Sequence, residues 1–407
     1  AQSKRSPSEQ WVEKFARYYT PIIMAASLVM FLVPPLLFTA DWATWFYRSL
    51  VLLVIACPCA LVISTPVSIV AALAASARNG VLVKGGVYME APARLRAIAM
   101  DKTGTITRGE PAVQKIVPLA EHDERELLER AGAMEVHSNH PIARAIVNYC
   151  REIGVSFDPA KNFTAVRGKG ATATFEGRAF WLGSHRYLEE RGQATPQVHE
   201  QLEAISAAGH TVVVIGNDDH VCGLIAVADA VRPESKDTIQ AIHDADVEHV
   251  VMLTGDNEGT AKAIAAEAGI DDVRAELLPE DKVEAVESLV QQYGQVAMIG
   301  DGINDAPALA RATLGIAMGA AGTDAAIEAA DIALMSDDLS KIPWLIRHAR
   351  RTLAIIRQNI ALSLFIKATF VALTVAGYAS LWAAIAADMG ASLIVTFNGL
   401  RLLRGNS

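Results

Sequence analysis

Four stretches of almost wholly apolar residues limit what this chain can fold into. Each has about the 17–25 residues that an α-helix needs to cross a bilayer. They form two pairs, and between the pairs the composition is that of an ordinary soluble protein. Buried helices of a soluble protein are the alternative, but four of this length in one chain are rare. We therefore predict four transmembrane helices around one large soluble insertion. The apolar stretches are residues 21–38, 50–73, 355–377 and 381–397.

Charges beside these stretches predict their orientation. Basic residues flank both ends of the chain, whereas the linker of residues 39–47 carries Asp41 and no Lys or Arg. Basic flanks mark the cytoplasmic side of a membrane. Because four crossings return the chain to the same side, we expect a multi-pass cell-membrane protein, in a bacterium an inner-membrane protein, with cytoplasmic soluble domains. The basic residues are Lys4, Arg5, Lys14, Arg17, Arg401 and Arg404.

Net charge and cysteine usage exclude other classes. The net charge is −9 and no basic stripe occurs, so nucleic acid is not an expected partner. Cys57 and Cys59 lie in an apolar stretch, and Cys150 and Cys222 stand alone in the insertion. This is no disulfide framework, which suits a reducing cytoplasm. No cleavable signal peptide opens the chain, and its start at Ala1 leads us to expect part of something longer.

Three short apolar runs in the insertion each end in a loop that contains Asp. Helical patterns lie between the runs, which is typical of a parallel α/β sheet. Ligands bind beyond the carboxyl ends of such strands, so we expect the three loops to converge. The units of run and loop are residues 98–105, 250–256 and 296–305.

A long segment between the first two units has patterns of its own. Helices are predicted at 124–150 and 196–208, and strands at 172–175, 211–215 and 221–227. We therefore expect an α+β domain inserted into the α/β domain. The predicted divisions are a membrane part at 1–80 and 351–407, a discontinuous α/β domain at 81–110 and 227–350, and the inserted domain at 111–226.

The first loop offers the groups needed to transfer a phosphoryl group. Asp101 at a strand end can be a carboxylate nucleophile, although an Asp in this position can also cap a helix. Thr103, Gly104 and Thr105 offer hydroxyls and close backbone approach to a phosphate. These residue types favour transfer through an aspartyl-phosphate.

Residues further along the chain complete this chemistry. Lys282 follows a helix-start signal at 279–281 and can neutralise phosphate charge. Asp301 and Asp305 are carboxylates of the kind that hold Mg²⁺, which prefers oxygen ligands. The chain contains no Gly-x-x-x-x-Gly-Lys-Ser/Thr motif, so a P-loop NTPase is not expected.

Over nearly its whole length the chain resembles P-type ATPases of the haloacid dehalogenase superfamily. The motifs are Asp-Lys-Thr-Gly-Thr-Ile-Thr at 101–107, Thr-Gly-Asp at 254–256 and Gly-Asp-Gly-Ile-Asn-Asp at 300–305. The resemblance implies that ATP phosphorylates Asp101, that Lys282 and Thr254 contact the phosphate, and that residues 229–232 lie on the hinge side. The catalytic residues it implies are Asp101, Lys102, Thr103, Thr254, Gly255, Asp256, Lys282 and Asn304. The magnesium site it implies consists of Asp101, Thr103, Asp301 and Asp305.

One position separates the chain from soluble phosphatases of the superfamily. Those carry a second Asp two residues after the nucleophile as a general acid/base, and here that residue is Thr103. Losing this group slows hydrolysis by roughly 10²–10⁴-fold. A longer-lived phosphate on Asp101 is what a pump needs while its ion moves.

The inserted domain carries Ser-Asn-His-Pro at 138–141 and Gly-Lys-Gly at 168–170. A His before a Pro-initiated helix, such as His140, is often only a surface residue. Together, however, the two motifs resemble the nucleotide-binding domain of the heavy-metal subgroup of P-type ATPases. The resemblance implies that His140 contacts the adenine ring, that Gly168 and Gly170 let the nucleotide approach the backbone, and that Glu135 belongs to the same site. The subgroup often has Asn where this chain has Ser184, so Ser184 is not included.

The last candidate site lies inside the membrane. Cys57-Pro58-Cys59 falls roughly 12–15 Å into its stretch, near the middle of a ~30 Å core. Proline can be a simple kink, but it also frees carbonyls, and cysteine offers a soft ligand for Zn²⁺, Cd²⁺, Pb²⁺ or Cu⁺. Lys367 and Asp388 fall at mid-depth, where a charge costs at least ~2.5–3.5 kcal/mol. They are either a structural pair or part of the site.

Cys-Pro-Cys resembles the heavy-metal subgroup, and Lys367 with Asp388 resembles its zinc/cadmium/lead-exporting branch. The implied function is ATP-driven export of these ions, with Mg²⁺ and ATP, at Cys57, Cys59, Lys367 and Asp388 in a lipid bilayer. A Cu⁺ exporter, a membrane-tethered phosphohydrolase and a non-enzymatic metal-binding scaffold are the alternatives. The Thr-Gly-Glu loop of the actuator domain does not occur. We therefore expect the actuator domain and N-terminal helices of the same pump to precede residue 1.

Overall fold

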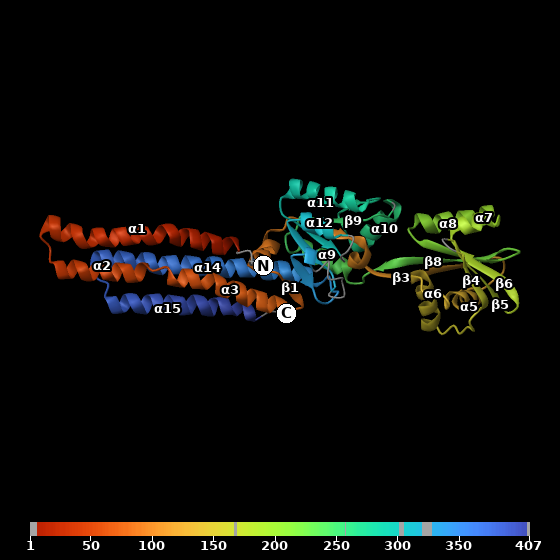
Figure 1. The fold of residues 1–407 in the computed structure, drawn as a ribbon, viewed down its shortest axis with the longest axis horizontal. Coiled ribbons are helices and arrows are strands. Elements are labelled where there is room, and N and C mark those ends of the chain that lie inside the picture. Colours follow the sequence, from red (N-terminus) through yellow and green to blue (C-terminus); the bar gives the residue numbers. More distant parts are fainter. Residues whose placement is uncertain (1–5, 167–168, 257, 301–304, 320–327, 405–407) are drawn as a thin grey trace.

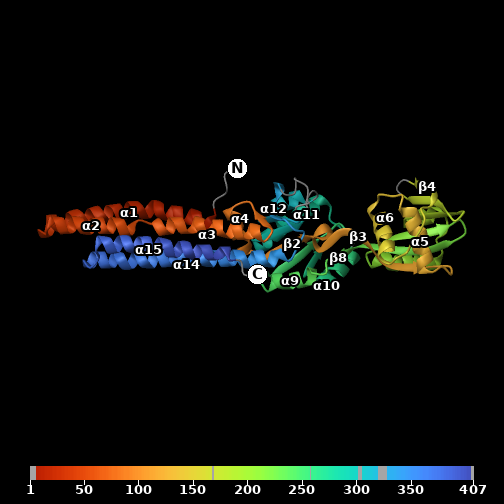
Figure 2. The same cartoon turned by 90° about the horizontal axis from the view of Figure 1, so that it is seen from below.

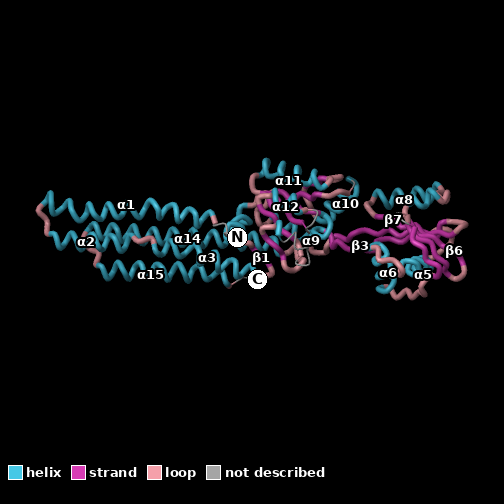
Figure 3. The backbone as a smooth tube through the Cα atoms, in the orientation of Figure 1, coloured by secondary structure: helices cyan, strands magenta, loops and turns pink. Residues whose placement is uncertain are grey.

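The computed structural model describes residues 6–166, 169–256, 258–300, 305–319 and 328–404. These residues form an elongated molecule of three parts in a row (Figure 1). A bundle of long helices occupies one end, a central domain built on one sheet follows, and an outer domain built on a second sheet lies at the far end. The backbone trace shows the strands confined to the central and outer domains (Figure 3).

Five long helices form the bundle among the described residues. They contain four segments long and apolar enough to cross a membrane, which confirms the expected number of spans. The second span is interrupted at Cys57 and Pro58, because proline lacks the N–H that an uninterrupted helix needs. The helices are α1 (Pro7–Phe38), α2 (Trp42–Ala56), α3 (Cys59–Arg78), α14 (Lys341–Ala376) and α15 (Leu381–Leu400).

The surface and the connections of the bundle fit a membrane. Its outward side chains include Leu28, Phe365 and Ile394, which are more than half exposed in the absence of lipid. A contiguous apolar surface of this kind is unfavourable in water and favourable in a bilayer. Helix α1 begins and α15 ends beside the central domain (Figure 1, Figure 2). This agrees with an insertion and two flanking segments on one side of the membrane.

The central domain is built on a sheet of seven strands among the described residues. All neighbouring strands are parallel except β1 and β13, which are antiparallel. The order across the sheet is β1 (Val81–Val83), β13 (Ile332–Leu334), β12 (Leu314–Ala317), β11 (Val296–Gly300), β2 (Ala97–Asp101), β9 (His249–Leu253) and β10 (Asp272–Arg274). The short strands expected at 98–100, 250–253 and 296–299 are therefore confirmed as β2, β9 and β11.

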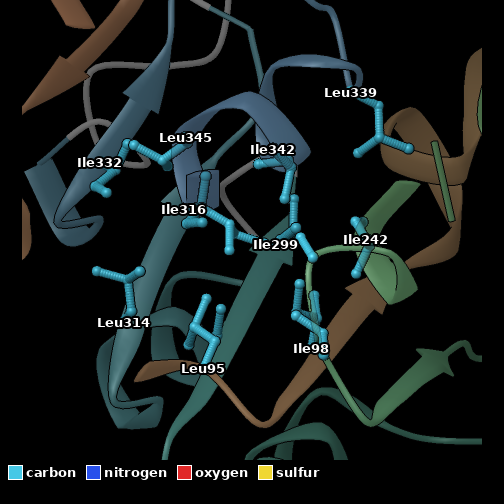
Figure 4. Close-up of a cluster of buried hydrophobic side chains, with 14 of the residues drawn as sticks. Leu95, Ile98, Ile242, Ile299, Leu314, Ile316, Ile332, Leu339, Ile342 and Leu345 are labelled. Carbon is cyan, nitrogen blue, oxygen red and sulfur yellow. The ribbon is translucent and has the colours of Figure 1, made fainter. Parts of the chain in front are cut away.

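Both faces of this sheet are buried, as a parallel sheet requires. One face carries Ile98 and Ile299, which pack with Ile242 of α9 and Ile342 of α14 (Figure 4). The other face packs against α11 and α12. The helices around the sheet are α4 (Gly86–Glu90), α9 (Ser235–His243), α10 (Glu258–Ala268), α11 (Pro279–Tyr293) and α12 (Ala306–Arg311), with single turns η1 (Ala91–Arg94), η2 (Lys102–Ile106) and η3 (Arg401–Leu403).

The outer domain is built on an antiparallel sheet with helices on both faces. Phe180 and Leu182 face one helix pair, α5 and α6, and the residue between them, Trp181, faces the other pair, α7 and α8. The strand order is β3 (Thr107–Pro118), β8 (Val221–Val231), β7 (Thr211–Asn217), β6 (Arg178–Gly183), β5 (Gly170–Phe175) and β4 (Lys161–Val166). The helices are α5 (Glu124–Glu135), α6 (Pro141–Glu152), α7 (His185–Glu190) and α8 (Pro196–Ala207).

The predicted fold class is thus confirmed, with one element corrected. The sequence analysis expects one helix over 124–150, and the structure has two, because the residue before Pro141 is disfavoured in the α conformation. His140 instead adopts an extended conformation and caps α6. The domain boundaries stay a prediction, because β3, β8 and α14 each run across one of them.

Candidate functional site

Asp101 is the last residue of β2, which lies between β11 and β9 in the central sheet. The loops after these three strands meet at one edge of the sheet, because their carboxyl ends point the same way. Asp101 is buried, and the whole residue is 5% exposed. The chain then turns sharply at Gly104, whose φ of 72° is a conformation that glycine adopts without strain. The buried Thr105 hydroxyl in this turn has no hydrogen-bond partner among the described residues, and a bound phosphate is one group that could supply it.

Lys282 lies next to Asp101 although 181 positions separate them in the sequence. Its Nζ lies 2.5 Å from Asp101 Oδ1 and 2.8 Å from Asp305 Oδ1. Burial lowers the pKa of Lys282, but the two carboxylates more than offset it, so the pKa lies above its ordinary value. The ammonium therefore stays charged at neutral pH. It lies between the negatively charged carboxylates of Asp101 and Asp305.

A second lysine joins the first loop to the loop after β9. Lys102 Nζ lies 2.7 Å from Asp256 Oδ2. The backbone N–H of Asp256 donates to Thr254 Oγ1 at 3.1 Å, and Thr254 is 2% exposed. Gly255 lies between these two residues, and Thr103 lies in the turn after Asp101 with an exposed side chain. The structure thus brings the first two motifs together.

Three candidate residues fall outside the described part of the chain. These are Gly168 of the nucleotide site and Asp301 and Asn304 of the third loop. Of the residues expected to hold Mg²⁺, the structure describes Asp101 and Asp305, which share the Lys282 ammonium, and the exposed Thr103. The carboxylate oxygens of Asp101 and Asp305 already lie around one positive charge, the Lys282 ammonium. Oxygen donors of this kind suit a hard divalent cation such as Mg²⁺.

Strands β3 and β8 form an antiparallel two-stranded ribbon that joins the central and outer domains. Residues 229–232 bond this ribbon to the central domain. Asp229 Oδ2 accepts from Thr107 Oγ1 at 2.5 Å and from the Gly109 N–H at 3.1 Å. Burial raises the pKa of Asp229, and the bond from Thr107 opposes this. Arg232 Nε donates to Thr105 O at 3.0 Å. The ribbon is therefore tied to the same turn that carries the nucleophile candidate.

The outer domain contains a cavity of about 450 Å³, within the size range of small-molecule sites. Its lining includes three expected residues, Glu135, His140 and Gly170. A Cβ at Gly170 would lie 2.0 Å from Leu182 O, so no larger residue fits there. Other lining residues are not in the predicted site. Ser138 and Lys169 lie in the motifs that carry the resemblance, Phe163 has no local signal, and Ser184, which the sequence analysis leaves out, lines the cavity as well.

Glu135 and His140 differ in exposure. Glu135 ends α5 and is 8% exposed, and this burial raises its pKa from 4.5 to about 7. His140 is exposed, and its Nδ1 accepts from the Ile142 N–H at 3.3 Å. The cavity therefore offers an exposed aromatic ring and a carboxyl group that is partly protonated at neutral pH.

Lys367 of α14 and Asp388 of α15 lie beside the break between α2 and α3. Lys367 Nζ lies 3.0 Å from Asp388 Oδ1, and donates to Ile55 O at 3.0 Å and to Cys57 O. Helix α2 ends at Ala56 and α3 begins at Cys59, so the carbonyls of Ile55 and Cys57 lie at the break between the helices, where the Lys367 ammonium reaches them. Three of the four residues expected at the transport site thus meet at one point.

The fourth residue, Cys59, is bonded to Cys57 through its sulfur in the structure. The sequence analysis expects two separate thiolates, so this bond is a departure from it. The two Cα atoms are 5.5 Å apart, a separation that permits a disulfide. The same closeness lets both sulfurs reach one ion, which binds thiolates and therefore the reduced pair.

Residues 95–313, just over half of the chain, match the haloacid dehalogenase-like hydrolase family. The chain belongs to this family. The match contains Asp101, Lys282 and Asp305, whose contacts define the site in the central domain. In this haloacid dehalogenase-like hydrolase, β2 is the first strand of the matched region. The outer domain is inserted after the turn that follows β2.

Curated relatives indicate a narrower group of similar proteins within this family. The chain is 46% identical over 409 residues to a probable cadmium-transporting ATPase of Staphylococcus aureus (strain MRSA252). It is 45% identical over 407 residues to a zinc/cadmium/lead-transporting P-type ATPase of Escherichia coli (strain K12). Each comparison covers 99% of this chain but 56% and 54% of the relative, so the chain spans about half the length of these relatives. The resemblance to heavy-metal P-type ATPases is confirmed.

Solved structures agree. A zinc-transporting PIB-type ATPase in its E2·Pi state matches with a TM-score of 0.88 and 44% identity, over 96% of this chain and 63% of that one. The catalytic domain of a CPx-ATPase, CopB-B, matches with a TM-score of 0.52 and 28% identity, over 67% of this chain and 97% of that one. The first match extends through the helical bundle, and the second is a catalytic domain alone.

Proposed function

We propose that this chain exports a soft divalent cation, Zn²⁺, Cd²⁺ or Pb²⁺, across a cell membrane by using ATP, through a phosphate on Asp101. The observation that carries the proposal is the contact of Lys282 Nζ with both Asp101 and Asp305 at the edge of the central sheet. The membrane is the cytoplasmic membrane of a bacterium, which is the inner membrane in a host with two, and the central and outer domains face the cytoplasm.

Phosphorylation uses the groups at the end of β2. One carboxylate oxygen of Asp101 attacks the γ-phosphorus of ATP, the bond from that phosphorus to the β–γ bridging oxygen breaks, and ADP leaves. The Lys282 ammonium, held charged by its neighbours, attracts the negative phosphoryl oxygens. Mg²⁺, when bound, supplies further positive charge, and Asp101, Thr103, Asp305 and the undescribed Asp301 would hold it.

ATP reaches this edge from the outer domain. The cavity lined by Glu135 and His140 takes the adenosine part of the nucleotide, and the β3–β8 ribbon lets the outer domain turn toward Asp101. Asp229 and Arg232 anchor the ribbon at its central end, so the pivot lies beside the turn that carries the nucleophile. Domain rotation about a few residues is a common way to assemble such a site.

The charges in the bundle favour a divalent ion. Two thiolates and Asp388 carry three negative charges, and Lys367 carries one positive charge, so an ion of charge +2 makes the cluster neutral. A monovalent ion such as Cu⁺ leaves one negative charge, which is costly to bury. Zn²⁺ also accepts sulfur and oxygen ligands together, whereas Cu⁺ gains little from a carboxylate.

Metal-stimulated ATP hydrolysis by the full-length pump tests the choice of ion. Zn²⁺, Cd²⁺ and Pb²⁺ are expected to stimulate hydrolysis, and Asp388→Asn is expected to remove the stimulation. Asp41→Asn is the matched control, because Asp41 is an exposed helix cap that Asn can replace. Stimulation by Cu⁺ alone, or full Zn²⁺ stimulation of the Asp388→Asn pump, contradicts the proposal.

A further inference from the structure

A group of metal-type ligands lies in the outer domain, apart from the residues of the two sites above. His122 precedes α5, His220 lies in the turn between β7 and β8, and Cys222 is the second residue of β8. Their ligand atoms all lie within 4.8 Å of one another. The two His residues are 98 positions apart in the sequence, so only the fold brings them together.

The distance between the two imidazoles is close to what a shared ion requires. Their Nε2 atoms are 3.0 Å apart. Two nitrogens at 2.0–2.1 Å from one tetrahedral Zn²⁺ lie about 3.4 Å from each other. To share an ion, the two nitrogens must therefore separate by a few tenths of an ångström, and the rings, which are 14° from parallel, must turn so that both Nε2 atoms face it.

A carboxylate fixes the tautomer that a metal ligand needs. His122 Nδ1 lies 2.9 Å from Glu126 Oε2 and 3.2 Å from Arg130 Nη1. The carboxylate can only accept, so in the tautomer that bonds to it Nδ1 carries the proton and the Nε2 lone pair faces His220. Arg130 Nη2 donates to Glu126 Oε1 at 2.6 Å and holds the carboxylate in place. Metal-binding histidines regularly have this arrangement, with a carboxylate on the outer nitrogen.

The donor types and local charges select the ion. Cys222 is fully buried. The Cys222 proton leaves when a cation binds the sulfur. The thiolate, Glu126 and Arg130 then sum to one negative charge, which favours a cation. One sulfur and two imidazole nitrogens suit Zn²⁺ and similar ions, and not Mg²⁺ or Ca²⁺.

We propose that His122, His220 and Cys222 bind one zinc-type divalent cation in the outer domain, with Glu126 positioning His122. Three protein ligands leave a fourth position open. The ion ties the start of α5 to the β7–β8 turn, and α5 ends at Glu135 in the nucleotide cavity. This site shares no residue with the proposed transport site, and the inference does not depend on the transport proposal.

Cobalt binding to the full chain in detergent tests the site. Cys57→Ser and Cys59→Ser are introduced together first, so that no thiolate remains at the bundle site. This chain is expected to bind one Co²⁺ with thiolate-to-cobalt charge-transfer absorption, and Zn²⁺ is expected to displace it. Cys222→Ala should abolish the absorption, and Glu126→Gln should weaken binding about 10–100-fold.

Two matched variants serve as controls. Cys150→Ala removes the other buried thiol of the outer domain, and His199→Gln removes a half-buried imidazole of α8, and both should leave binding unchanged. Absorption that is absent at the start, or that survives Cys222→Ala, overturns the proposal. If Cys222→Ala does not fold, His122→Gln and His220→Gln decide the question, and unchanged affinity in both overturns the proposal.

Discussion

Glu135→Gln tests whether burial of this carboxyl costs stability. The folded outer domain holds a proton on Glu135 up to about pH 7, whereas the unfolded chain releases it near 4.5. Between these values the folded state binds more protons, so its stability falls as pH rises. At 1.36 kcal/mol per pKa unit, the rise of about 2.5 units makes the loss at most roughly 3.4 kcal/mol above pH 7. Glutamine stays neutral, so the variant should not show this part of the loss.

Hydrogen exchange in the full chain measures the effect locally. The opening free energy of amides in α5 and α6 is compared near pH 5 and near pH 8, after correction for intrinsic exchange rates. The unmodified chain should lose protection at the higher pH, and Glu135→Gln should lose less. Glu152→Gln, an exposed change at the end of α6, is the control. Equal losses in the Glu135→Gln and unmodified chains would show that burial does not raise this pKa.

Two further changes test the nucleotide site and the ribbon. His140→Asn keeps a side chain that caps α6 but removes the ring, so ATP affinity measured by calorimetry should fall by up to about tenfold without a change in thermal midpoint. A lower midpoint with unchanged affinity would make His140 structural. Arg232→Met leaves the carbonyls of Gly104 and Thr105 without their donor, and should destabilise the central domain by at least ~3 kcal/mol in denaturant titrations. An unchanged transition would remove this anchoring role.

The parts that the sequence predicts well have a local signal. Strands β2, β9 and β11 are short apolar runs that end in polar loops, and the transmembrane helices are long apolar runs. The break at His140 was missed, because the helical pattern continues across it and only Pro141 marks it. Strand β3 was missed because its exposed and half-buried residues follow no alternation.

Contacts between distant residues have no such signal. The distance between Lys282 and Asp101 depends on how α11 meets the sheet, and residue type alone only suggests the pairing. The cluster of His122, His220 and Cys222 is not predicted, because His122 lies 98 positions before His220 and the short His-Val-Cys run at 220–222 does not by itself indicate a metal site. Its members become recognisable when the β7–β8 turn is seen beside the start of α5.

The most direct test of the central claim is the location of phosphate after reaction with ATP. The full-length pump is incubated briefly with γ-³²P-ATP and Mg²⁺, quenched in acid and divided, and one half is treated with hydroxylamine, which cleaves acyl-phosphates. We predict acid-stable label that hydroxylamine removes and that mass spectrometry assigns to Asp101, with none in an Asp101→Asn pump. Label that resists hydroxylamine, or that persists in Asp101→Asn, would contradict the mechanism.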